Sequence, residues 1–323
     1  MRKAGVIIGF LVGVASCFNN PVIPNQDVPD PGAILYEGLY YVATTGGDAE
    51  GNKFPIHRSS DLQTWEHVGF AFHSHNLPTW VGTPDSDFWA PELHIVNGKF
   101  MLYFTARDKP TNILCIGAAV GQSITGPYTD VGKPLIRQEH VGSIDCTILK
   151  DGGHLYLIWK DDGNGNRPQL PTWIWAAPLN TEGTQVIGDW KQLIKNDLPW
   201  ENDLVEGPWI IQRSGWWYLF YSANGYCGPA YAVGVARSRT PLGPYEKHSQ
   251  PILTSNSRFK GPGHCSVIAT KENPNQYVMI YHAWLDGKVC NGNNRIMNVD
   301  YVQWGQDEWP TVNQSSAIST FLE

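Results

Sequence analysis

The stretch LVEGPWIIQRSGWWYLFYS, residues 204–222, places one carboxylate, Glu206, in front of two apolar runs typical of a strand pair. The second run, which opens at Gly215, is one of five similar segments rich in aromatic and aliphatic residues. The other four are GLYYVAT from Gly38, GKFMLYFTA from Gly98, GHLYLIWK from Gly153 and NQYVMIYHA from Asn275. They recur at intervals of 60, 55, 62 and 60 residues, and such a period indicates a repeat architecture.

Short β-rich runs, broken by Gly, Pro, Asn and Asp, dominate the rest of the sequence, and helical periodicity is nearly absent. Several copies are followed by another strand-like segment, such as FPIHRSSDLQTWEHVG at residues 54–69. Five units of about four short strands each predict an all-β, five-bladed β-propeller. A β-sandwich with incidentally similar hairpins is the alternative, and the even spacing of the five copies disfavours it.

The composition bounds the class of protein. The chain has 323 residues, of which 42 % are hydrophobic and 16 % charged, with a formal net charge of −7. Because phosphates demand a basic surface, this low and mixed charge argues against a nucleic-acid partner. Zinc-type Cys/His clusters and nucleotide, flavin or haem motifs do not appear in the sequence. We therefore expect that no cofactor is required.

The first residues, MRKAGVIIGFLVGVASC, combine a basic start, an apolar run and a small-residue exit. This pattern predicts a secretory signal peptide over 1–17, too short for a stable membrane span. The remaining residues, 18–323, then form a single five-bladed propeller domain, secreted and without a membrane span. The segment VASC also resembles a lipoprotein cleavage box, so lipid attachment at Cys17 is an alternative.

Six cysteines in a secreted chain permit disulfides, although their pairing cannot be derived from the sequence alone. Cys227 and Cys290 both lie in loops rich in Gly and Asn. We expect these two cysteines to form a pair.

Acidic residues recur in front of the repeated strands. Asp30, Glu92, Asp145 and Glu206 precede the opening residues of their units by eight, six, eight and nine positions, and His264 holds a comparable place in the fifth unit. Taken singly, such residues are often turn formers. In a propeller, however, matching positions of the innermost strands face one another around the axis. We therefore expect these five side chains to converge on one pocket, where crowded carboxyls acquire different pKa values.

Two separated carboxyl groups with aromatic walls suit the cleavage of a glycosidic bond. One protonates the leaving oxygen and the other activates water, roughly 6.5–9.5 Å away in inverting enzymes. Trp89 and Trp209 could stack on sugar faces, and Glu92 could serve either the substrate or blade packing. Arg295 could donate hydrogen bonds to sugar hydroxyls, with a structural salt bridge as the alternative.

The motifs NPVIPNQDVPDPGAI, SSDLQTWEHVG, WAPELHIVNGKF, SIDCTILKDGGHLYLIWK, EGPWIIQRSGWWYLFYS and GPGHCSVI resemble those of glycoside hydrolase family 43, in order and with blade spacing. The resemblance runs from about Asn20 to near the C-terminus. It implies an inverting five-bladed propeller enzyme that acts on arabinose- or xylose-containing plant polysaccharides or oligosaccharides.

By motif, the resemblance implies that Asp30 is the general base, Glu206 the general acid, and Asp145 the residue that tunes and orients the acid. It implies that His264 lies near the centre of the channel, where some members keep a calcium ion or a water cluster. PDPG stands where many members have PDPS, and cysteines follow both Asp145 and His264. These departures leave the exact sugar open.

We expect an exo-acting α-L-arabinofuranosidase, because the bulky loop at 72–88 favours a walled pocket. We also expect the protein to function as a monomer. A β-xylosidase and an endo-arabinanase of the same family are the nearest alternatives. A retaining fructan-cleaving propeller, with its carboxyls roughly 5–5.5 Å apart, and a non-catalytic sugar-binding propeller are the more distant ones.

Overall fold

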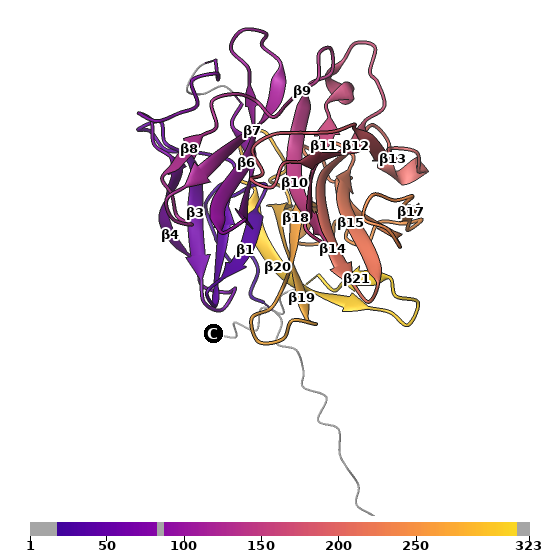
Figure 1. Ribbon diagram of the computed structural model, residues 1–323. Coiled ribbons are helices and arrows are strands. Elements are labelled where there is room, and N and C mark those ends of the chain that lie inside the picture. The colour runs from indigo at the N-terminus through magenta and orange to yellow at the C-terminus, as the bar shows by residue number, and fades with distance from the viewer. Residues whose placement is uncertain (1–17, 83–86, 315–323) are drawn as a thin grey trace, which may run out of the picture.

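The computed structural model describes residues 18–82 and 87–314, which form five antiparallel sheets arranged around a common axis (Figure 1). The predicted five-bladed β-propeller is therefore confirmed. The predicted signal peptide, Cys17 and part of the loop at 72–88 lie outside the described residues. Within the described part of the chain, no helix has the length and apolarity needed to cross a membrane.

Each blade contributes its strands in sequence order from the axis outward, and the second blade carries one extra short strand, β9, paired with β7. Blade one consists of β1 (Gly32–Tyr36), β2 (Leu39–Ala43), β3 (Lys53–Ser59) and β4 (Glu66–Phe72). Blade two consists of β5 (Trp89–Val96), β6 (Lys99–Arg107), β7 (Leu114–Gly121), β8 (Tyr128–Asp130) and β9 (Ile136–Arg137). Blade three consists of β10 (Ser143–Asp151), β11 (His154–Asp161), β12 (Trp173–Leu179) and β13 (Lys191–Lys195). Blade four consists of β14 (Val205–Arg213), β15 (Trp216–Ala223), β16 (Ala232–Ser238) and β17 (Glu246–Lys247). Blade five consists of β18 (Phe259–Ala269), β19 (Tyr277–Leu285), β20 (Ile296–Trp304) and β21 (Pro310–Val312). Two short 3-10 helices lie in loops, at η1 (Gly163–Gly165) and η2 (Pro199–Glu201).

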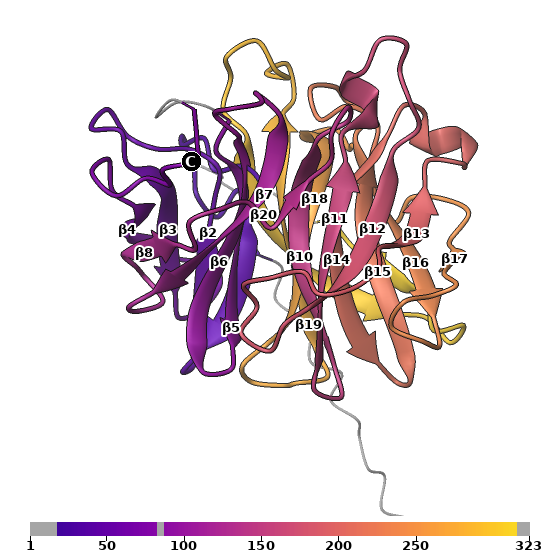
Figure 2. The same cartoon turned by 45° about the horizontal axis from the view of Figure 1, so that its top comes forward.

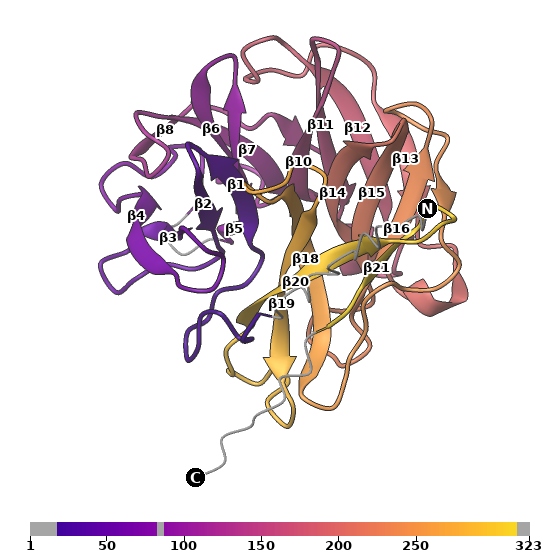
Figure 3. The same cartoon turned by 90° about the horizontal axis from the view of Figure 1, so that it is seen from below.

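The five repeated segments of the sequence form the second strand of each blade: β2, β6, β11, β15 and β19. They are almost uniformly buried because both faces of a blade pack against neighbouring blades, so the apolar runs are continuous rather than alternating. The first strands, β1, β5, β10, β14 and β18, surround the axis and contact one another around it (Figure 3). Residues at the same register in different blades therefore meet.

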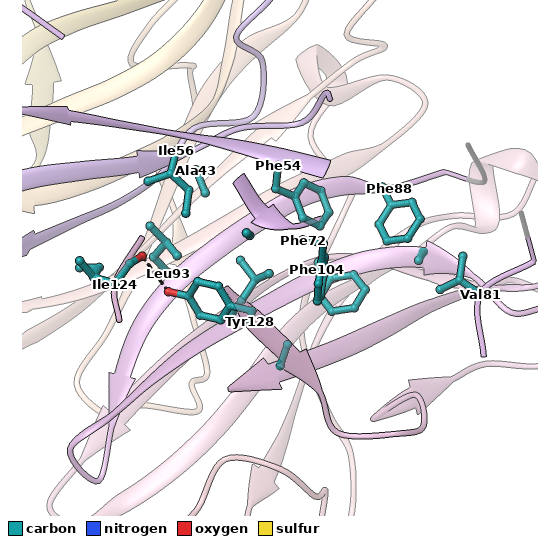
Figure 4. Close-up of a cluster of buried hydrophobic side chains, with 14 of the residues drawn as sticks. Ala43, Phe54, Ile56, Phe72, Val81, Phe88, Leu93, Phe104, Ile124 and Tyr128 are labelled. Carbon is teal, nitrogen blue, oxygen red and sulfur yellow. Dashed lines mark hydrogen bonds between the residues drawn. The ribbon is translucent and has the colours of Figure 1, made fainter. Parts of the chain in front are cut away.

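Aromatic side chains fill the space between blades one and two (Figure 4). Phe104 lies with its ring centroid 5.2 Å from that of Phe72 and 5.8 Å from that of Phe54, and all three side chains are fully buried. The hydroxyl of Tyr128 is also buried and donates a hydrogen bond to the carbonyl of Ile124. Such ring pairs contribute about 0.5–1.5 kcal/mol each beyond the burial of their apolar area, so they hold the two blades firmly together.

The N-terminal segment closes the propeller onto its last blade. The amides of Val22 and Val28 donate hydrogen bonds to the carbonyls of Met297 and Arg295, both at 2.9 Å. The chain then runs directly into Asp30 and β1. Closure thus brings the start of blade one beside the start of β20.

The predicted disulfide is confirmed: Cys227 is bonded to Cys290, with their Cα atoms 5.2 Å apart. It joins the β15–β16 loop of blade four to the β19–β20 loop of blade five. Cys115, Cys146 and Cys265 are free and buried.

Candidate active site

A cavity of about 400 Å³ opens at one end of the axis. Six of the eight side chains considered for the site line it: Asp30, Trp89, Asp145, Glu206, His264 and Arg295. The loops above this end belong to different blades (Figure 2). Glu92 and Trp209 do not line the cavity.

In every blade, a residue with left-handed backbone lies where the first strand borders the cavity. These residues are Asp30, Ala90, Asp145, Gly207 and His264, with φ angles between 46° and 56°. In β5, β10, β14 and β18 the residue lies at a break in the strand register, a β-bulge. Bulges re-aim a side chain, and left-handed non-glycine residues gather at functional sites. This repeated backbone device directs Asp30, Asp145 and His264 into the cavity.

Contrary to our expectation, the pairing register of the strands shows that Glu206 and Glu92 do not occupy the position that Asp30, Asp145 and His264 share. Glu206 precedes the left-handed residue of its blade, Gly207, and so holds the position that Trp89 holds in blade two. Both side chains still line the cavity. Glu92, in contrast, lies two residues beyond Ala90.

The side chain of Glu92 is buried below the cavity. One of its oxygens accepts a hydrogen bond from the Thr147 hydroxyl at 3.0 Å and lies 3.0 Å from His94 Nε2. Burial raises the pKa of Glu92 well above its usual value and lowers that of His94 to about 3. The expected contact between Glu92 and a substrate therefore has no support in its position.

Asp30 has the environment of a permanently ionised carboxylate. Arg295 Nη1 lies 3.2 Å from its Oδ1, and the Nδ1 atoms of His282 and His264 lie 3.2 and 3.5 Å away. Burial raises the pKa of Asp30, but the charges of Arg295 and His264 outweigh it and leave that pKa well below its ordinary value. Arg295 thus forms the salt bridge that we weighed as an alternative, and it lines the cavity as well.

Glu206 is held through both of its carboxyl oxygens. The Tyr231 hydroxyl donates a hydrogen bond to Oε1 at 2.7 Å, and Lys160 Nζ donates one to Oε2 at 3.1 Å. Burial raises the pKa of Tyr231 well above its ordinary value, so the phenol remains a donor. Our reading of the sequence missed both partners.

Asp145 lies between the other two carboxyls. Its Oδ2 accepts the backbone N–H of Gly207 at 3.2 Å and lies 4.0 Å from His264 Nδ1. Burial raises the pKa of Asp145 to about 6, with the charges of Glu206 and Asp30 adding to the rise and His264 and Lys160 opposing it. The three acids thus share a cavity but have different environments, as a division between acid and base requires.

Tyr226 stands at the rim, 47 % exposed, and lines the cavity. The Arg295 guanidinium lies 5.0 Å from the centroid of the Tyr226 ring. The backbone carbonyl of Tyr226 accepts a hydrogen bond from Trp284 Nε1 at 2.8 Å. Tyr226 directly precedes Cys227, so the disulfide anchors this part of the rim. Trp209, which we expected to stack on sugars, is buried, donates its Nε1–H to the carbonyl of Val267 and lies away from the cavity.

The family resemblance implied either a calcium ion or a water cluster beside His264, and for calcium the residues present do not form a matching ligand set. Ca²⁺ takes six to eight oxygen ligands, whereas the nearest donors here are imidazole nitrogens and carboxylates already engaged by Arg295 and Gly207. Across residues 18–82 and 87–314, no group of three or more His, Cys, Asp or Glu side chains is placed to hold a metal ion.

The family model for glycosyl hydrolases family 43 matches residues 18–310. A xylosidase/arabinosidase 43B of Humicola insolens is 28 % identical over 94 % of this chain and 56 % of its own length. An extracellular exo-α-(1→5)-L-arabinofuranosidase of Streptomyces avermitilis is 25 % identical over 91 % of this chain and 62 % of its own. The chain thus spans somewhat more than half the length of these two relatives. The crystal structure of a thermostable family-43 glycoside hydrolase superposes with a TM-score of 0.81, at 29 % identity, over 92 % of this chain and 96 % of that one.

Proposed function

The chain belongs to glycosyl hydrolases family 43, an inverting glycosidase family, and from that premise we propose that it hydrolyses arabinose- or xylose-containing plant polysaccharides or oligosaccharides at the cavity described above. The observation that carries the proposal is the meeting of Asp30, Asp145 and Glu206, from blades one, three and four, in one cavity. Their different environments match the separate needs of a base, a modulator and an acid.

Asp30 is the general base. Its carboxylate, kept ionised by Arg295, removes a proton from the water that attacks the anomeric carbon. Glu206 is the general acid and donates its proton to the glycosidic oxygen as the bond from that oxygen to the anomeric carbon breaks. One water is consumed, and the configuration at the anomeric carbon inverts. Asp145 orients the acid through the N–H of Gly207.

Within this class we propose an exo-acting α-L-arabinofuranosidase, with a β-xylosidase and an endo-arabinanase as alternatives. The small cavity, of about 400 Å³ with Tyr226 at its rim, supports removal of terminal sugars over cleavage within a chain. Catalysis by the proposed carboxyls needs no cofactor.

Export through residues 1–17 also belongs to the proposal, with lipid attachment at Cys17 as its variant. Fractionation of the producing cells tests it, because Cys17→Ser abolishes membrane retention only if the lipid is present. We further propose that the enzyme acts as a monomer, which sedimentation analysis tests.

The functional test is a panel of aryl α-L-arabinofuranoside, β-D-xyloside and β-D-fructofuranoside, together with linear arabinan. We expect release from the arabinofuranoside, loss of activity in Asp30→Asn and Glu206→Gln, and no change in the surface control Glu246→Gln. Activity on the fructoside alone would favour the retaining scheme. Sugar binding without release from any substrate would favour a non-catalytic propeller.

A further inference from the structure

A second ring of side chains encircles the axis just outside the five left-handed residues. Each member lies on or just after the second strand of its blade, seven positions after the residue that opens the repeat. The members are Thr45, Thr105, Lys160, Ser222 and His282. Three are hydroxyls, and two are ionisable.

In four blades the ring member accepts the backbone N–H of the left-handed residue in the next blade. The four bonds are Ala90 N–H to Thr45 Oγ1 at 2.7 Å, Asp145 N–H to Thr105 Oγ1 at 3.1 Å, His264 N–H to Ser222 Oγ at 2.8 Å, and Asp30 N–H to His282 Nδ1 at 3.2 Å. The ring therefore fixes the bulges from which the cavity is built.

The third blade breaks the pattern. An ammonium group has no acceptor, so Lys160 cannot bind the N–H of Gly207, and Asp145 Oδ2 binds it instead. Lys160, 1 % exposed, donates to Glu206 Oε2 and Asp162 Oδ1, both at 3.1 Å. The fold thus uses a cation at the one junction that leads to Glu206.

The two departures from hydroxyl side chains lie at the two blade junctions that lead to Glu206 and to Asp30. We propose that Lys160 is the positioning residue of the general acid and His282 the positioning residue of the general base. This inference rests on the proposed function, because it assigns roles relative to that acid and base.

Lys160 faces the carboxylates of Glu206, Asp162 and Asp145. Burial lowers its pKa, but these three carboxylates outweigh burial and raise it above the ordinary value, so the ammonium is a permanent charge. Through its hydrogen bond to Oε2 it therefore fixes the orientation of the Glu206 carboxyl.

His282 faces Asp30, Arg295 and His264, and burial lowers its pKa to about 4. The neutral ring accepts the Asp30 N–H at Nδ1, while its Nε2 has no hydrogen-bond partner among the described residues. The His282 ring stacks on that of Tyr231, with centroids 5.7 Å apart and planes at 8°. Because Tyr231 donates to Glu206, this stack links the base side of the cavity to the acid side.

The test compares two glycosides of whichever sugar the parent enzyme cleaves: one with a 2,4-dinitrophenyl leaving group and one with a sugar leaving group. Only the latter needs full protonation by the acid. For Lys160→Met we expect kcat to fall about 10²-fold on the sugar glycoside and less than about 10-fold on the dinitrophenyl glycoside. Lys160→Arg should restore part of the activity on the sugar glycoside.

His282→Leu should lower kcat by similar factors on the two glycosides, because activation of water is common to both. His282→Asn, whose amide oxygen can accept the Asp30 N–H, should recover much of the loss. Thr45→Val removes the equivalent bond to Ala90, a residue that is neither the acid nor the base, and serves as the matched control with an unchanged ratio between the two glycosides.

The ratio between the two glycosides is measured on one preparation and does not depend on the fraction that folds. Equal losses on both glycosides in Lys160→Met would overturn the assignment of Lys160. The assignment of His282 would be overturned if His282→Leu lost much more activity on one glycoside than on the other, or if it kept full activity. A parent enzyme that cleaves no glycoside would instead refute the proposed function itself.

Discussion

Asp145 Oδ2 accepts the backbone N–H of Gly207 at 3.2 Å, across the boundary between blades three and four. Gly207 directly follows Glu206, so the carboxylate of one blade fixes the backbone that carries the carboxylate of the next. The bond accounts structurally for an orienting role of Asp145. It also explains why these two acids lie close enough for their charges to interact.

Asp145→Asn should remove the negative charge of the side chain but keep its contact, because the amide oxygen can still accept a hydrogen bond from the Gly207 N–H. We expect activity to fall about 10²-fold, since the charge that modulates Glu206 is lost. The pKa of Asp145 is raised to about 6 from an ordinary value near 3.8, so the folded protein binds this proton more tightly than the unfolded chain does. Its protonation therefore stabilises the fold at low pH, and that stabilisation is lost as pH rises from about 4 to about 6.

In Asp145→Asn the melting temperature should therefore depend less on pH between 4 and 6, and at pH 7 it should equal or exceed that of the parent. Thermal unfolding at a series of pH values measures both quantities. A variant that melts well below the parent at pH 7 would show that the carboxylate is a structural support instead.

Arg295→Met should shift the acid limb of the activity profile. Removing the guanidinium leaves Asp30 buried beside His264 and His282, so its pKa should rise and the base should become protonated at a higher pH. Profiles of kcat/KM against pH for the parent, Arg295→Met and Arg295→Lys measure this shift, with the lysine variant intermediate. An acid limb common to all three would mean that Arg295 does not control Asp30.

Replacing both Cys227 and Cys290 by Ser should weaken substrate binding more than it slows chemistry. The bridge spans 63 residues of sequence, and closing a loop of that length contributes about 4 kcal/mol in the chain-entropy model. We expect a lower melting temperature and a raised KM with kcat nearly unchanged, because the bridge anchors Tyr226 at the rim. Reduction of the parent by a thiol should reproduce both effects.

Two variants of Tyr226 test whether the aromatic ring of this residue contributes to substrate binding at the rim of the cavity. Tyr226→Phe keeps the ring beneath Arg295 and should behave as the parent, whereas Tyr226→Ala should raise KM as the loss of the disulfide does. Equal KM values for Tyr226→Ala and the parent would assign the effect of the disulfide to stability alone.

Much of this architecture could be predicted because the repeat is nearly exact in register. In blades one to four the left-handed residues Asp30, Ala90, Asp145 and Gly207 all lie eight positions before the residue that opens the repeat. The expected residues Glu92 and Glu206, at six and nine positions, already depart from this spacing. The departures matter because a bulge redirects each side chain locally, and a sequence pattern does not reveal a bulge.

The partners of the carboxyls were harder to foresee. Lys160 ends the repeated segment GHLYLIWK, and His282 is the second-last residue of NQYVMIYHA. Their significance appears only when the next blade is placed beside them. Tyr231 lies in a loop outside the repeat and reaches Glu206 from the side. Contacts between blades decide these environments, and they depend on the closed ring rather than on local sequence.

The most direct test of the central claim, that Asp30 and Glu206 act from opposite sides of one sugar, is proton NMR of the product released at the earliest times. Cleavage of an aryl α-L-arabinofuranoside should first yield β-arabinofuranose, before mutarotation, and neither Asp30→Asn nor Glu206→Gln should yield it at a comparable rate. Release of the α-anomer first, or undiminished release by either variant, would contradict the account.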